Sequence, residues 1–308
     1  MMRRLLPAFC LALALLTLLP LSAGALPGRL LISDGRGGIE LFDAKNGDRR
    51  RVAERAVRPA FAADGKSFAY IREGGCFRTP EGCYTEYSIF LKSLADHRAQ
   101  APGRQVFGWR RFFVRAVDVA PGGRLIFSAE PGPGPGRRGR GLEIYSAAAD
   151  GSRIRRLTHN RVFDNDPAVS PDGRYIAFSR RVNGRGQIFT MRTDGSGVLR
   201  VTRDQRKDRE PAWSPGGRRI LYVSQPAGAE GLRGREIYAI RADGQNRRRR
   251  LTFSRVVENE PTYSPDGRWI AYVQLGELWA MRPGGTDPRP VLAPRKPPGF
   301  EGGIDWAR

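Results

Sequence analysis

Side chains that exchange protons near neutral pH are scarce in this sequence. Its 308 residues include two histidines, His97 and His159, and histidine is the side chain that ordinarily titrates near pH 7. A Gly-x-Ser-x-Gly elbow, a His-Glu-x-x-His motif and a phosphate-binding loop are all missing. These absences disfavour the commonest hydrolase, metalloprotease and nucleotide-binding mechanisms. We therefore expect a protein that is not an enzyme.

Long apolar runs are missing from all but the N-terminal end of the chain. There, two arginines precede the apolar run Leu11–Leu19, and the small residues 23–25 fit a cleavage site. The run is shorter than the roughly 20 apolar residues that cross a bilayer as a helix. The pattern predicts a signal peptide over residues 1–25 and one domain over residues 26–308. The mature chain is then extracytoplasmic, periplasmic or secreted, without a transmembrane segment; an uncleaved N-terminal anchor is the alternative.

Cysteine is also rare, with three in the whole chain. Only Cys76 and Cys83 follow the predicted signal peptide, and they lie close together in the sequence. An isolated pair in an exported protein is typical of a disulfide that closes a small loop. A metal site would need further ligands. We therefore predict that Cys76 and Cys83 form a disulfide.

Negative charge is in short supply. The chain has 53 Lys and Arg against 31 Asp and Glu, a net charge of +22. Such a surface attracts polyanions, but no nucleic-acid-binding motif accompanies it, so we expect no specific nucleic-acid partner. Only five of the basic residues are lysines. The excess of arginine is explained either by codon composition or by a selected anion site.

What the sequence has in abundance is an internal repeat. Each copy holds a short apolar strand, a Ser-Pro-Asp-Gly type turn and a second apolar strand. The spacing between successive copies is the length of one four-stranded propeller blade. The three best copies and the two weaker ones are Pro167–Phe178, Pro211–Tyr222, Pro261–Tyr272, Pro59–Tyr70 and Val117–Phe127.

Two more strands follow the second one in each repeat. The third alternates in polarity, as in Gln187–Arg192, and an Asp-Gly turn follows it. The fourth carries an Arg-Leu-Thr type pattern, as in Arg250–Thr252. Four antiparallel strands per repeat predict one blade.

The two ends of the chain complement each other. The segments Leu30–Ser33, Ile39–Asp43 and Arg50–Val52 are expected as second, third and fourth strands with no first strand before them. Near the other end, Gly303–Trp306 matches a first strand, with Trp306 at the repeat position of Trp213. Pairing the two ends yields a composite blade and leaves no open sheet edge. The sequence predicts an all-β, six-bladed β-propeller of four-stranded antiparallel blades.

The repeat Pro-x-aromatic-Ser-Pro-Asp-Gly-Arg-x-Ile-Ala-aromatic, preceded by the Arg-Leu-Thr strand, resembles the repeat of TolB and of the wider WD40-like propeller group. The resemblance covers most of residues 30–308. TolB carries an α/β domain before its propeller, and here only a few residues separate the predicted cleavage site from the first strand. The resemblance implies that first strands line a central channel. It also implies that the loops after the second and fourth strands share one face, opposite the Ser-Pro-Asp-Gly turns.

An acidic repeat stands directly before the predicted first strands. The sequence reads Asp164-Asn-Asp166, Asp208-Arg-Glu210 and Glu258-Asn-Glu260, and each copy is followed by Pro. Asp118 and Asp305 lie near equivalent places in the weaker copies. The candidate binding residues at the channel mouth are Asp166, Glu210, Glu260, Asp118 and Asp305.

Convergent carboxylates suit either a Ca²⁺ ion or a basic segment of a partner. For a metal, Asp166, Glu210 and Glu260 are the candidate ligands; we otherwise expect no cofactor. A structural role is the alternative and the one we expect, in which each carboxylate pairs with arginine or accepts a backbone N–H in its own turn.

The function expected from the sequence is therefore that of an exported, monomeric binding scaffold for a protein or a cell-envelope polymer. It would use the loop-rich face, which carries the irregular segments 72–87, 130–141 and 225–235, and the channel mouth. The alternative is a channel-mouth lyase or glycosidase on a saccharide or acidic polymer, in which Asp166, Glu210 and Glu260 carry out acid–base chemistry.

Overall fold

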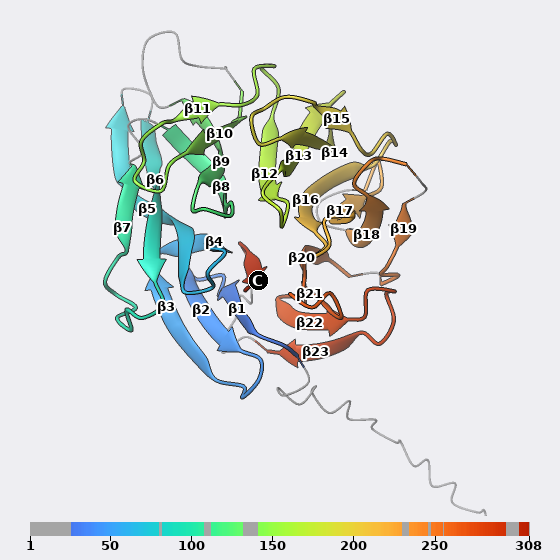
Figure 1. Cartoon of the computed structure of the whole chain (residues 1–308), viewed down its shortest axis with the longest axis horizontal. Coiled ribbons are helices and arrows are strands. Elements are labelled where there is room, and N and C mark those ends of the chain that lie inside the picture. The colour runs from blue at the N-terminus through green and yellow to red at the C-terminus, as the bar shows by residue number, and fades with distance from the viewer. Residues whose placement is uncertain are drawn as a thin grey trace, which may run out of the picture.

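A computed structural model describes residues 26–79, 82–107, 112–131, 141–229, 234–245, 248–254, 256–293 and 302–307. For 76–79, 82–86, 107, 112 and 131 it describes the backbone alone. Within these ranges every regular element is a strand, and the strands form six sheets around a central axis (Figure 1). Nowhere in the described part is there a helix that is long and apolar enough to span a bilayer.

Each sheet has four antiparallel strands and forms one blade. Blade 1 contains β4 (Ala56–Phe61), β5 (Ser67–Thr79), β6 (Gly82–Ser93) and β7 (Arg104–Phe107). Blade 2 contains β8 (Phe112–Val119), β9 (Leu125–Pro131), β10 (Glu143–Ala147) and β11 (Arg155–Arg156). Blade 3 contains β12 (Asp164–Val169), β13 (Tyr175–Val182), β14 (Arg185–Arg192) and β15 (Leu199–Arg200). Blade 4 contains β16 (Lys207–Trp213), β17 (Arg219–Gln225), β18 (Glu236–Arg241) and β19 (Arg249–Arg250). Blade 5 contains β20 (Glu258–Tyr263), β21 (Ile270–Gln274), β22 (Glu277–Met281) and β23 (Arg289–Leu292).

The sixth blade is composite, as the sequence predicted. It contains β24 (Ile304–Trp306), β1 (Arg29–Ser33), β2 (Gly38–Asp43) and β3 (Arg49–Glu54), in that order across the sheet. Trp306 pairs with Leu30, and hydrogen bonds from Ser33 N to Gly303 O and from Ala307 N to Arg29 O, both 2.9 Å, extend the pairing. The first strand of every blade lies nearest the axis (Figure 1). The predicted six-bladed fold is confirmed.

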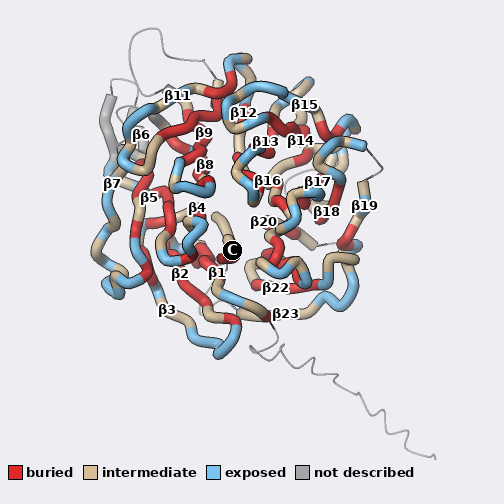
Figure 2. The backbone as a smooth tube through the Cα atoms, viewed as in Figure 1, coloured by how far each residue is buried: buried red, intermediate tan, exposed pale blue. Residues whose placement is uncertain are grey.

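The core lies between the blades rather than inside any one of them. Six clusters of buried apolar side chains occur among the described residues, and each draws on two neighbouring blades. The aromatic residues that share one repeat position on the first strands are all buried: Phe61, Trp213, Tyr263 and Trp306. Figure 2 shows the buried segments concentrated on the strands, with exposed residues at the turns and the outer rim. Burial at six seams stabilises the closed ring.

The two signature patterns of the repeat have local physical causes. In the turn after β12, the Ser170 hydroxyl hydrogen-bonds Asp172 at 2.5 Å and accepts the Tyr175 N–H at 2.9 Å, and Gly173 has φ of +70°. In the Arg-Leu-Thr pattern, the Thr158 hydroxyl accepts the N–H of Ile144 at 3.0 Å. The same contact, at 2.9 Å, joins Thr202 to Ile188 and Thr252 to Ile237. The patterns therefore fix the turns and the fourth strands.

The predicted disulfide lies outside the side chains that the structure describes. The backbone places Cys76 on β5 opposite Thr85 and Cys83 on β6 opposite Arg78. The two cysteines thus stand on paired strands, and their disulfide stays a prediction. Most of the loop 130–141 and the segment 230–233 also lie outside the described residues.

Candidate functional site

A β-bulge interrupts the first strand of blades 1, 3, 4 and 5 at the same place. The residue at the bulge has a positive φ in each: Arg58 (55°), Asp166 (49°), Glu210 (54°) and Glu260 (55°). A left-handed backbone costs a residue with a Cβ roughly 1–2 kcal/mol. Because four such residues share one repeat position, the left-handed conformation there is set by the fold and not by the residue type.

We call Arg58, Asp166, Glu210 and Glu260 the channel ring. All four line the cavity inside the propeller and are partly buried. The Arg58 guanidinium lies 3.9 Å from the Asp166 carboxylate. Electrostatic attraction by Glu260, Asp166 and Glu210 opposes the effect of burial and raises the pKa of Arg58. One guanidinium thus faces three carboxylates, and the ring carries an excess of negative charge when all are ionised.

Hydrogen bonds link the ring from blade to blade. Glu210 accepts the backbone N–H of Glu260 at 2.8 Å, and Glu260 accepts the backbone N–H of Gly303 in the composite blade. Gly303 has φ of +126°, and a Cβ there would lie 3.0 Å from the backbone of Arg58. A side chain is therefore excluded at this position, and the composite blade contributes only backbone to the ring.

Two of the ring carboxyls, Glu210 and Glu260, hold protons more tightly than free carboxyls do. Burial and the nearby Asp166 charge raise the pKa of Glu210, against the attraction of Arg58 and the hydrogen bond from the Glu260 N–H. Burial raises the pKa of Glu260 to about 7, against the attraction of Arg58 and with a contribution from Glu210. The Oε2 atom of Glu260 is buried and has no hydrogen-bond partner among the described residues. A buried acceptor of this kind is costly unless something outside the fold satisfies it.

The ring separates two cavities. One, of about 470 Å³, runs from the ring to the Ser-Pro-Asp-Gly turns and is rimmed by Pro121, Pro171, Pro215 and Pro265. The other, of about 450 Å³, lies on the loop-rich side between blades 3 and 4 and shares Arg58, Asp166 and Glu210 with the first. The space available to a ligand is therefore found on both sides of the ring, including the side with short, repetitive turns.

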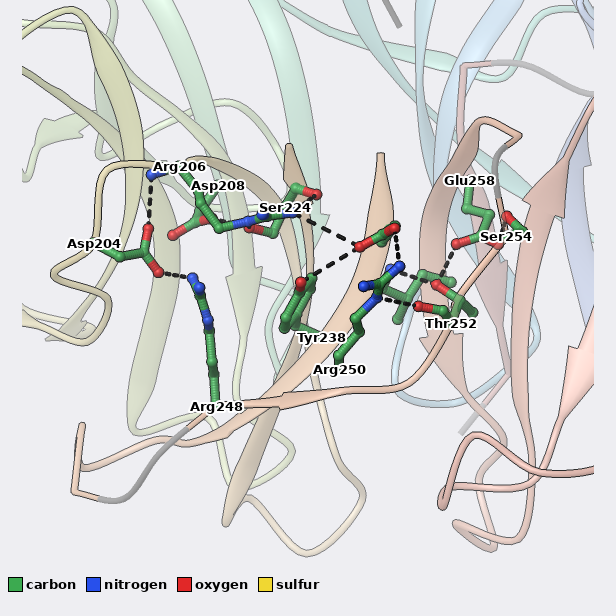
Figure 3. Close-up of polar contacts among 12 residues, drawn as sticks. Asp204, Arg206, Asp208, Ser224, Tyr238, Arg248, Arg250, Thr252, Ser254 and Glu258 are labelled. Atoms are coloured by element: carbon green, nitrogen blue, oxygen red, sulfur yellow. Dashed lines mark hydrogen bonds and ion pairs between the residues drawn. The ribbon is translucent and has the colours of Figure 1, made fainter. Parts of the chain in front are cut away.

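In each copy of the acidic repeat, the first acidic residue lies inside the blade and away from the channel ring, unlike the second. Asp164 makes two hydrogen bonds of 2.8 Å to Arg180. Asp208 accepts the Ser224 hydroxyl at 2.6 Å. Glu258 accepts the hydroxyls of Ser254, at 2.5 Å, and of Thr252 (Figure 3). These three carboxylates are buried and anchor strands within or beside their blades, so only the second acid of each pair reaches the ring.

Asp118 and Asp305 are not ring members. Both stand at one repeat position, two residues after the position of the channel ring residues on the first strand. Each connects two blades. Asp118 accepts the N–H of Val119 at 2.7 Å and that of Val169 in the next blade at 2.6 Å. Asp305 likewise accepts the N–H groups of Trp306 at 2.9 Å and of Phe61 at 2.7 Å. We call these two residues the seam aspartates.

Replacing either seam aspartate by alanine is expected to lower the free energy of unfolding by about 1–3 kcal/mol, because two charge-assisted acceptors are lost and two buried N–H groups are left unpaired. The losses in D118A and D305A should add, because the sites lie at different seams. Urea denaturation measures both. The control is D243A, which removes an exposed carboxylate paired with Arg241 in its own turn. Equal losses in all three variants would contradict the role.

Arg58 is the ring residue that the sequence analysis missed. It precedes Pro59 in a weaker copy, as Asp166 precedes Pro167 in a strong one. Strict alignment of the copies would have shown a cation at a position that is otherwise acidic. No group of three or more His, Cys, Asp and Glu side chains in the described ranges is placed to hold a metal ion.

Six four-stranded blades closed around a charged channel define the protein as a six-bladed β-propeller. Its repeats are similar to those of TolB: the family model described as "TolB beta propeller domain" matches residues 122–235. The chain is also similar to a protein TolB homolog from Chlorobaculum tepidum, 34% identical over 79 residues. That match covers 26% of this chain and 18% of the homolog. The predicted resemblance to TolB-like repeats is confirmed.

Solved structures extend the likeness over nearly the whole chain. The crystal structure of TolB from Acinetobacter baumannii has a TM-score of 0.68 at 18% identity, and the likeness covers 91% of this chain and 66% of that one. The oligogalacturonate lyase from Vibrio parahaemolyticus has a TM-score of 0.55 at 11% identity, over 86% of this chain and 74% of that one. At such identities the likeness shows the fold alone, because one fold hosts many functions.

Proposed function

We propose that this chain is an exported, non-catalytic binding scaffold that takes a basic segment of a partner protein into its channel. The observation that carries the proposal is the channel ring, where three carboxylates face one guanidinium at the base of a cavity of about 470 Å³. The volume is within the range of ligand sites, roughly 300–1,000 Å³. The predicted signal peptide and the TolB-type repeats support an extracytoplasmic location.

The charge of the ring favours a cation. A lysine or arginine side chain entering from the proline-rimmed side would meet Glu260, whose Oε2 has no partner among the described residues. A charge-assisted hydrogen bond would satisfy that atom and favour its ionised form. A Ca²⁺ ion is the other cation that such carboxylates suit, and a cell-envelope polymer with amino groups is the other partner.

The test uses residues 26–308 as bait for the proteins of a cell-envelope extract, with a photo-crosslinking residue in place of Ala63 on the wall of the cavity. We expect one partner to crosslink through a segment that contains lysine or arginine. Crosslinking should fall at least tenfold in E210Q/E260Q, which keeps the size of both side chains and one acceptor oxygen of each but removes their negative charge. It should be unchanged in D243N, an exposed carboxylate variant.

Three outcomes would overturn the proposal: no crosslink, a crosslink that E210Q/E260Q leaves unchanged, or a crosslinked segment without a basic residue. A parallel arm measures melting with and without about 2 mM Ca²⁺, a concentration on the order of a weak extracellular calcium site. Calcium stabilisation of the parent that E210Q/E260Q abolishes, in the absence of any crosslink, assigns the ring to the metal instead.

The second candidate function is that of a channel enzyme. The pKa of Glu260, raised to about 7, suits a residue that takes and returns protons near neutral pH. The lyase or glycosidase would use Glu260 with Glu210 and Asp166. An assay with polygalacturonate and with neutral oligosaccharides decides it: product formation that E260Q abolishes and D243N retains supports catalysis, and no product in the parent contradicts it.

A further inference from the structure

The cavity of about 450 Å³ between blades 3 and 4 has chemistry of the opposite sign to the channel ring. We call it the blade 3–4 pocket. Its wall includes parts of β12, β13, β14 and β16, and it opens on the loop-rich face. Five basic residues line it, against three acidic ones. The basic residues are Arg58, Arg180, Arg181, Lys207 and Arg209.

Two of these cations are already neutralised inside the fold. Arg180 is paired with Asp164 through two hydrogen bonds, and Arg58 faces the ring carboxylates. The other three, Arg181, Lys207 and Arg209, form no ion pair within the described part of the chain. Arg209 donates to the neutral Gln225 amide, at 3.3 Å. Three cations thus line one cavity without the close carboxylate contact that Arg180 has.

The three acidic residues of the pocket contribute little negative charge to its open part. Asp208 is buried, accepts the Ser224 hydroxyl, and has its pKa raised by burial. Asp166 and Glu210 belong to the channel ring, where Arg58 attracts both. The electrostatic balance of the open part of the pocket therefore favours an anion.

The pocket also has an aromatic wall. Phe163 lines the pocket and is 43% exposed. The guanidinium of Arg181 lies 4.5 Å from the centre of its ring, so the arginine is held over the phenyl face rather than free in solvent. Gly184 forms part of the rim, and a Cβ there would meet nothing within 4 Å. The entrance beside the aromatic wall is open.

We propose that the blade 3–4 pocket binds an anionic sugar, a sugar ring that carries a carboxylate or a phosphate group. The volume exceeds what a bare inorganic anion fills and suits a small organic ligand. Arg181, Lys207 and Arg209 take the acidic group, since guanidinium and ammonium groups pair with either anion. Phe163 offers a flat apolar surface to the C–H face of the sugar. The pocket shares Arg58, Asp166 and Glu210 with the channel cavity, but the three cations that take the acidic group are not among the residues proposed to meet the partner segment.

The test is calorimetric titration of the mature chain with glucuronic acid, glucose 6-phosphate, glucose and inorganic phosphate at one ionic strength. We expect at least one acidic sugar to bind at least tenfold more tightly than glucose. R181Q/K207Q should lose at least tenfold in affinity for it. F163L should lose affinity for the sugar while leaving the weak binding of phosphate unchanged. The tighter of the two acidic sugars identifies the group that the pocket prefers.

The matched control is R174Q/R192Q, which removes two exposed arginines near the Ser-Pro-Asp-Gly turn of blade 3. It changes the net charge by the same amount and should keep full affinity. Equal losses in both double variants would show attraction by the basic surface as a whole, and would overturn the proposal. So would equal affinities for glucose and the acidic sugars, phosphate binding as tight as that of the tighter acidic sugar, or no binding by the parent. Melting curves confirm that all variants are folded.

Discussion

Replacing Trp306 by alanine is expected to lower the free energy of unfolding by about 3–5 kcal/mol, the cost of removing a large aromatic side chain from a core. Trp306 is 2% exposed and packs in the cluster between the composite blade and blade 5. Its indole N–H donates to the Pro27 carbonyl at 2.6 Å. The variant therefore weakens the seam that closes the ring. Urea denaturation monitored by circular dichroism measures the loss, since this signal does not depend on tryptophan fluorescence.

The control for this variant is F253A, because Phe253 is 73% exposed. We expect its stability to stay within about 0.5 kcal/mol of the parent, as for most surface substitutions. Aggregation of W306A at temperatures where F253A stays soluble would fit an opened seam with an exposed strand edge. A W306A protein as stable as the parent would show that β24 does not hold the ring closed.

The second large effect is a dependence of stability on pH that E260Q removes. The pKa of Glu260 is raised to about 7 in the folded protein, above its ordinary value of 4.5. The folded state therefore binds more protons than the unfolded state between these values. The stabilisation is complete below about pH 4.5 and is lost as the pH rises through about 7. The full shift corresponds to about 3 kcal/mol, and because the ring is open to channel water we expect roughly 1–2 kcal/mol.

Unfolding free energies at pH 5, 6, 7 and 8 measure this dependence. The parent should lose stability over the series. E260Q should lose much less, and the slope that it retains is assigned to Glu210, whose pKa is also raised. D243N is the control and should follow the parent, because the pKa of Asp243 is lowered and it titrates below this range. Identical slopes in the parent and E260Q would contradict the raised pKa.

Several features of this protein were determined by its sequence. The Ser-Pro-Asp-Gly turns, the Asp-Gly turns and the Arg-Leu-Thr strands are local patterns, and each is built from contacts within one repeat, such as Ser170 with Asp172 and Thr158 with Ile144. Because the patterns recur at the spacing of one blade, they predict the blades, their number and the composite closure. The sequence also located the acidic repeat.

The tertiary structure alone decided what each acid does. The bulges rotate Asp166, Glu210 and Glu260 into the channel, whereas the acids two positions earlier pair inside the blades; a strand pattern of period two does not reveal a bulge. The seam aspartates accept N–H groups from a neighbouring blade, which only the closed ring brings within reach. The pKa of Glu260 depends on burial by other blades and on Arg58, which belongs to blade 1 and is distant in the sequence. Contacts and burial of this kind arise from the packing of distant segments, and no local pattern encodes them.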